Sequence, residues 1–180
     1  MPILSERSHW LLLVILAVAV VGDLRSRRIP NQLIVIGIVS GMATGLLFHS
    51  LPGVIHALQG ALTALAVFLP FFALRMVGAG DVKLMLVVGT FVGASALLLI
   101  SLYTFILGGA LAIVAVLASG RARQLIDNLR LYLCTIAMRR YGDSGALPDL
   151  TVATALRLPY ALAIAGGTLF WIAQQSVKTV

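Results

Sequence analysis

The chain has 180 residues, of which 61% are hydrophobic and 11% are charged, and its mean hydropathy is +1.07. Soluble domains are about 45–50% apolar and about 25% charged, so this composition excludes a soluble protein and favours one all-α, membrane-embedded domain over residues 1–180. The net charge of +7 does not indicate a nucleic-acid partner, because the basic residues lie in short breaks between apolar runs and form no basic face.

Long apolar stretches, bounded by charges, Pro or Gly, follow one another along the chain. The stretch over residues 82–118 is too long for one span, because its 37 residues would form a helix of about 55 Å and the hydrocarbon core measures about 30 Å. We expect it to turn once, at the small residues 93–96. The prediction is therefore a polytopic protein of six transmembrane helices, at about residues 10–22, 33–48, 55–77, 82–94, 97–118 and 153–173.

The charges flanking these stretches predict the orientation of the chain. The first stretch is followed by Arg25 and further arginines and has no net positive charge before it, which is the reverse of a signal peptide, so we expect it to remain as a helix. With its N-terminus outside, the breaks at 23–32, 75–83 and 119–152 lie in the cytoplasm. Ten of the thirteen basic residues lie in these breaks and Arg157 lies near the inner end of the last span, so eleven obey the positive-inside rule, whereas Arg7 and Lys178 are outside.

Residues 121–140, in the predicted cytoplasmic loop 119–152, carry apolar side chains at near-helical spacing with arginines around them. This pattern favours a basic amphipathic helix on the anionic lipids of the inner leaflet, where each cation contributes about 1 kcal/mol. A solvated loop is the alternative interpretation.

Two features within the spans concern packing. Gly37, Gly41 and Gly45 share one helical face and form a doubled small-xxx-small pattern, which lets another backbone approach closely. Pro70 removes a helix hydrogen bond and predicts a kink before the Gly78-Ala79-Gly80 break.

Two carboxylates stand out among the few acidic residues. Asp23 and Asp81 each lie where an apolar helix meets an inside break, and an ionisable group at membrane depth costs about 2.5–3.5 kcal/mol on insertion scales, so each is a functional candidate. The structural alternative is an ion pair that fastens a helix end, between Asp23 and Arg27 or between Asp81 and either Arg75 or Lys83.

A pair of carboxylates supports a specific chemistry. Two carboxyl groups within a few ångströms of each other cannot both ionise, so one can draw a proton from water while the protonated one hydrogen-bonds a peptide carbonyl. Such general acid–base hydrolysis needs no metal and no cofactor. We expect no metal site, because His9, His49 and His56 lack the spacing of metal ligands and Cys134 is the only cysteine.

Two segments of the sequence carry a family resemblance: DLRSRRIPN at residues 23–31 and GAGDVKL at residues 78–84. They resemble the two signature segments of type IV prepilin peptidases, the GxGD class of aspartic membrane proteases, in the short form associated with Flp-type pili. The order of the predicted spans agrees with this family as well, so the resemblance covers most of the chain.

The resemblance implies that Asp23 and Asp81 are the catalytic pair, and that the substrate is a Flp-type prepilin whose basic leader is removed at the cytoplasmic face of the bacterial inner membrane. Gly78 and Gly80 would admit the substrate backbone close to Asp81. Pro30 and Asn31 would fix the turn into the second span, with Asn31 as a possible helix cap, and Lys83 would tune Asp81 or mark the membrane edge.

Long-form members of this family also N-methylate the new pilin terminus and carry a cytoplasmic insertion with paired CxxC motifs. This chain has neither feature, so we expect peptidase activity alone. Two other hypotheses stay open: a non-enzymatic membrane component, such as a small transporter or an assembly scaffold, and a related GxGD protease acting on preflagellin. The sequence gives no oligomeric state.

Overall fold

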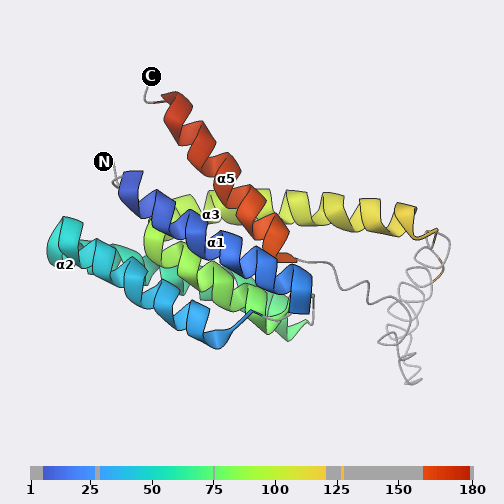
Figure 1. Ribbon diagram of the computed structural model, residues 1–180, viewed down its shortest axis with the longest axis horizontal. Coiled ribbons are helices and arrows are strands. Elements are labelled where there is room, and N and C mark those ends of the chain that lie inside the picture. Colours follow the sequence, from blue (N-terminus) through green and yellow to red (C-terminus); the bar gives the residue numbers. More distant parts are fainter. Residues whose placement is uncertain (1–5, 27–28, 75, 121–126, 128–159, 179–180) are drawn as a thin grey trace, which may run out of the picture. The chain divides into compact units, whose positions relative to one another are not determined.

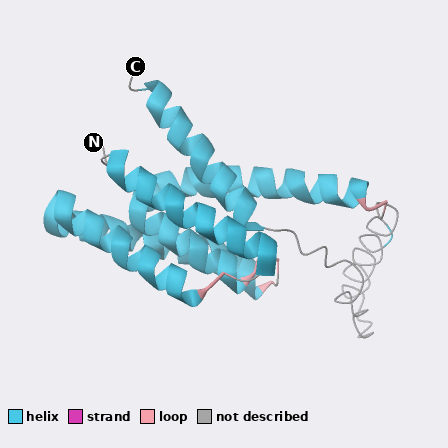
Figure 2. Cartoon of the chain, in the orientation of Figure 1, coloured by secondary structure: helices cyan, strands magenta, loops and turns pink. Residues whose placement is uncertain are grey.

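The computed structural model describes residues 6–26, 29–74, 76–120, 127 and 160–178, and all regular structure within these ranges is helical (Figures 1 and 2). The helices are α1 (Glu6–Ser26), α2 (Asn31–Ala73), α3 (Ala79–Ala118) and α5 (Tyr160–Lys178). The first three are long and apolar enough to cross a membrane. The all-α prediction is confirmed for this part of the chain. The predicted amphipathic segment 121–140 falls almost entirely outside it, as do residues 153–159 of the last predicted span.

The chain forms two compact units, one of residues 1–108 and 159–180 and one of residues 109–158. The larger unit holds α1, α2, α5 and most of α3, and it contains every candidate site residue. Within the smaller unit, α3 continues to Ala118, and Gly120, with a positive φ of 67°, follows the end of the helix.

Helix α2 reverses its direction at Ser50, whose φ and ψ of 56° and −146° are not helical. Gly45 and Gly53 lie eight positions apart, which in a straight helix would separate them by about 12 Å. Instead, a Cβ atom placed on Gly45 would lie 2.8 Å from the Gly53 carbonyl oxygen. The break therefore falls between the predicted spans 33–48 and 55–77.

The kink predicted at Pro70 stays a prediction. The backbone keeps helical dihedrals at this proline, and Ser50 is the only residue within α2 that leaves them. Helix α2 ends at Ala73, one turn after Pro70, and the Leu74 amide still donates to the Pro70 carbonyl oxygen at 3.0 Å. The ring thus lies close to the end of the helix, where a missing hydrogen bond disturbs few residues that follow.

Helix α3 bends back at Gly93, within the cluster 93–96 where the sequence predicts a turn. Gly93 has a φ of 76°, and the His56 imidazole occupies the space that a side chain would need, so only glycine fits. Gly60 of α2 packs against Gly89, before this bend, whereas Phe68 stacks on Phe105, after it, with ring centroids 5.2 Å apart. One segment of α2 thus contacts α3 on both sides of the bend.

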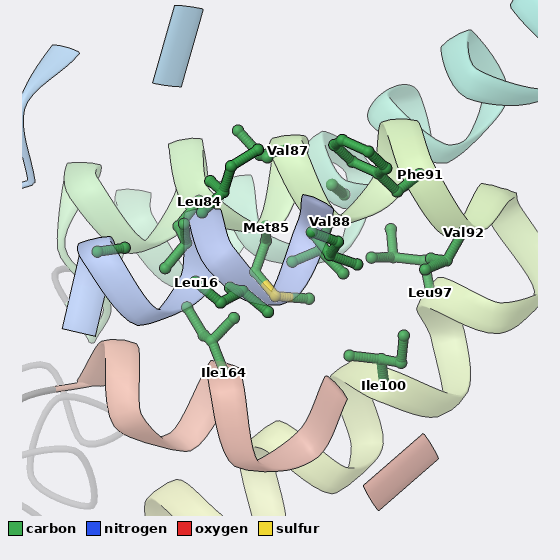
Figure 3. Packing of buried hydrophobic residues seen from close by; sticks show 14 of the residues in the cluster. Leu16, Leu84, Met85, Val87, Val88, Phe91, Val92, Leu97, Ile100 and Ile164 are labelled. Atoms are coloured by element: carbon green, nitrogen blue, oxygen red, sulfur yellow. The ribbon is translucent and has the colours of Figure 1, made fainter. Parts of the chain in front are cut away.

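The core lies between the first half of α3 and its neighbours α1, α2 and α5. Its largest fully buried side chains include Leu16, Met85, Phe91 and Ile164, which come from three helices (Figure 3). Many large apolar side chains elsewhere in the described residues remain exposed, as expected for helices that face lipid.

Close helix contacts depend on glycines. A Cβ atom on Gly37 would lie 2.6 Å from Val87 Cγ1, and Gly41 lies equally tightly against Thr90. The packing role predicted for the glycine face of residues 37, 41 and 45 is therefore confirmed. The mutual backbone contact of Gly60 with Gly89 was not predicted.

Candidate active site

Asp23 lies in the last turn of α1, and its carboxylate is held by a different helix. The side chain is half-buried, and its Oδ2 accepts a hydrogen bond of 3.3 Å from the backbone N–H of Ala161, in the first turn of α5. Amides in the first turn of a helix have no partner within that helix. Asp23 thus satisfies a donor that the start of α5 would otherwise leave open.

Asp81 is the third residue of α3 and holds the start of its own helix. Its Oδ2 accepts a hydrogen bond of 3.2 Å from the Gly78 N–H, while the Gly78 carbonyl oxygen accepts from the amides of Asp81 and Val82 at 3.1 and 3.2 Å. A side chain that reaches from the third helical position back to the cap residue is one half of a capping box. The Asp81 carboxylate is therefore fixed in orientation, and the side chain is half-buried.

The two aspartates share one neighbourhood. They are close enough for the charge of Asp23 to act on Asp81, and Asp81 in turn acts on the hydroxyl group of Tyr160, the residue beside Ala161. Three helix ends therefore meet here: the end of α1 and the starts of α3 and α5. The structure brings together the two carboxylates that the sequence singles out.

Contacts between the two signature segments extend beyond the aspartates. Lys83 Nζ donates to Asn31 Oδ1 at 2.9 Å. A Cβ atom on Gly80 would face the Ile29 side chain at 3.5 Å, which is ordinary van der Waals contact. The segments 23–31 and 78–84 thus lie side by side.

The expected cap of α2 by Asn31 is wrong. Asn31 is the first residue of that helix, Pro30 is the cap residue, and no side chain completes the cap. The Asn31 side chain accepts from Lys83 instead, so its oxygen is directed across to α3. The lysine is correspondingly engaged with an amide, whereas Arg27 and Arg75, the other proposed ion-pair partners, lie outside the described residues.

Among the residues that the structure describes, no group of three or more His, Cys, Asp and Glu side chains could hold a metal ion. The chemistry that this site offers comes from two carboxyl groups, backbone amides and nearby polar side chains.

Comparison with known protein families identifies the chain. The model of the type IV leader peptidase family matches residues 10–113, more than half of the sequence. The chain belongs to the type IV leader peptidase family. Family membership implies a protease, and together with the three long apolar helices it indicates a membrane protein. Searches among curated proteins and among solved structures gave no match.

The start of α5 is the part of the candidate site in this leader peptidase family member that no sequence motif marks. Tyr160 and Ala161 lie beyond the residues that the family model matches, and neither carries a motif. A signal was nevertheless present, because Pro159 predicts a helix start and six alternating spans would place that start on the same side as Asp23 and Asp81.

Gly78 is expected to be more sensitive than Gly80 to substitution by alanine. A Cβ atom on Gly78 would lie 3.0 Å from Asp81 Oδ2 and would push the carboxylate aside, whereas the same atom on Gly80 has room against Ile29. Because a misplacement of about 1 Å can cost about a hundredfold in rate, Gly78→Ala should lower leader cleavage by about ten- to a hundredfold. Equal loss in Gly80→Ala, measured as the cleavage rate of a prepilin in membranes, would show that close approach of substrate at Gly80 matters as much.

The hydrogen bond between Lys83 and Asn31 is expected to support activity, with both side chains contributing through this one contact. Lys83→Met and Asn31→Leu should each slow leader cleavage by about fivefold, because each removes one hydrogen bond worth about 1 kcal/mol. The double variant should be no slower than the single ones, because the residues act on each other. Additive losses in this double-mutant cycle would mean that the two side chains act separately, for example on substrate.

Proposed function

We propose that this protein is a prepilin leader peptidase that hydrolyses the peptide bond between the basic leader and the mature part of a Flp-type pilin, with Asp23 and Asp81 as the catalytic pair. The observation that carries the proposal is the convergence of these two half-buried carboxylates at three helix ends. The family match supports peptide hydrolysis over a transporter or a scaffold.

The chemistry follows from the proximity of the two acids. One carboxylate takes a proton from water, and the hydroxide attacks the carbonyl carbon of the scissile bond. The other carboxyl group, still protonated, hydrogen-bonds the carbonyl oxygen as negative charge develops on it. When the tetrahedral intermediate collapses, the C–N bond breaks and the leaving nitrogen takes a proton from the acid that received one from water.

The backbone donors keep both acids oriented for this reaction. The Ala161 N–H binds one oxygen of Asp23, and the Gly78 N–H binds one oxygen of Asp81. Within the part of the chain that the structure describes, no hydrogen bond engages the other oxygen of either carboxyl group, and we propose that these oxygens meet water and substrate. The backbone hydrogen bonds hold each carboxyl group in a fixed orientation, which lowers the cost of reaching the transition state.

The proposed topology has six membrane crossings. The direction of the chain reverses at Ser50 within α2 and at Gly93 within α3, so each long helix would supply two spans, with α1 and α5 as the others. In this arrangement the N-terminus is outside, and the aspartates lie at the cytoplasmic face of the bacterial inner membrane, where a prepilin leader would be accessible.

Only residues 27–30 separate α1 from α2, which leaves no room for the cysteine-rich insertion of methylating relatives, so we propose peptidase activity alone.

Asparagine substitutions test the pair. In cells that also produce a prepilin with a basic leader, Asp23→Asn and Asp81→Asn should each lower leader removal by about 10²–10⁴-fold, because an amide can neither accept nor deliver the required proton. Asp127→Asn is the matched control, since this acid is exposed and belongs to neither signature segment.

Membrane insertion and protein level, followed on immunoblots, should be the same in all three variants. Normal processing by either site variant would contradict the paired-carboxylate mechanism. A wild-type protein that processes preflagellin but leaves prepilin uncut would favour the preflagellin hypothesis.

A further inference from the structure

Asp23 is placed unfavourably within its own helix. It lies in the last turn of α1, where the partial negative charge of the helix end repels a carboxylate. The start of α5 offsets this repulsion, because a helix N-terminus carries a partial positive charge. Its Ala161 N–H also donates a hydrogen bond of 3.3 Å to Asp23 Oδ2. Because Ala161 is 138 positions away in sequence, this support depends on how α5 is docked.

The start of α5 is docked through Tyr160, whose ring lies against Gly108 of α3. A Cβ atom on Gly108 would lie 2.7 Å from Tyr160 Cε2 and 3.2 Å from Cζ, so the ring fills the space that any larger residue would take. Further along, Gly166 packs against Leu107 and Gly167 against Thr104. Glycines therefore allow α5 to lie very close to the second half of α3.

The opposite end of α5 is held against α1. The Trp171 and His9 rings meet edge to face with centroids 6.2 Å apart, and Trp171 is buried. Helix α5 is thus fixed along its length, and the packing of Tyr160 against Gly108 sets the position of its first turn.

We propose that the first turn of α5 is a positioning element of the active site, in which Tyr160, seated on Gly108, holds the Ala161 N–H against Asp23. This inference rests on the proposed peptidase function and extends the site beyond the matched residues 10–113. Tyr160 and Ala161 act through Asp23. A change that disturbs the contact of Tyr160 with Gly108 therefore slows the chemical step without weakening substrate binding.

Two glycines that are neighbours in α3 give a matched test. Gly108→Ala places a methyl group against the Tyr160 ring, whereas a Cβ atom on Gly109 has nothing within 4 Å. Both changes raise helix propensity equally. With purified full-length protein and a synthetic prepilin peptide in detergent, Gly108→Ala should lower kcat by about tenfold with KM unchanged, because Asp23 is misplaced by a fraction of an ångström. Gly109→Ala should keep wild-type values.

A second test removes the hydrogen-bond donor itself, the Ala161 N–H. Ala161→Pro deletes the N–H that binds Asp23, in the first turn of α5 where a helix tolerates proline, whereas the control Ala161→Gly keeps this N–H. Ala161→Pro should also lower kcat by about tenfold, and combining it with Gly108→Ala should add nothing, since both act through one hydrogen bond. Circular dichroism and thermal unfolding confirm that each variant is folded.

The outcomes separate this inference from the function on which it rests. If the wild type cleaves the peptide, Asp23→Asn does not, and both Gly108→Ala and Ala161→Pro match their controls, the positioning role is overturned while the peptidase function stands. A rise in KM with an unchanged kcat would also overturn it, because the first turn of α5 would then bind substrate. A wild type that cleaves no prepilin would overturn the proposed function and this inference together.

Discussion

The candidate site depends on one constraint: a carboxylate at the edge of an apolar helix bundle needs a hydrogen-bond donor, because leaving it unpaired away from water costs several kcal/mol. The protein meets this constraint with backbone amides at helix starts, whose donors have no other partner. The start of α3 serves Asp81 through Gly78, and the start of α5 serves Asp23 through Ala161. The arrangement of both acids therefore follows from where two helices begin.

Glycine-mediated packing determines where those helices begin relative to each other. The contacts of Gly37 with Val87, of Gly60 with Gly89 and of Gly108 with Tyr160 bring α2, α3 and α5 closer than larger residues would permit. In a membrane, where lipid tails are as apolar as the helices, such close contact is a main source of helix association. The same contacts that stabilise the bundle thus position the proposed catalytic pair.

The sequence predicted what depends on local pattern and missed what depends on tertiary contact. Apolar runs and their boundaries predicted an all-α chain, a turn at Gly93 and two aspartates at helix ends, because each leaves a signal within a few residues. The cap assigned to Asn31 was wrong, since its oxygen is engaged by Lys83 from another helix. The contact of Asp23 with Ala161 joins residues 138 positions apart, so no pattern within either segment pairs them, and only Pro159 and the alternation of spans indicated where α5 begins.

The central claim is that the side chains of residues 23 and 81 lie next to each other. It is tested most directly by cross-linking in membranes, with Cys134→Ser removing the native thiol and with Asp23→Cys combined with Asp81→Cys. A short bifunctional thiol reagent should join the two positions, detected as one linked peptide pair by mass spectrometry. The pair Trp10→Cys and Asp81→Cys, with the first thiol near the other end of α1, should stay unlinked. Two thiols at positions 23 and 81 that each react fully with a monofunctional reagent and yet never cross-link would contradict the account.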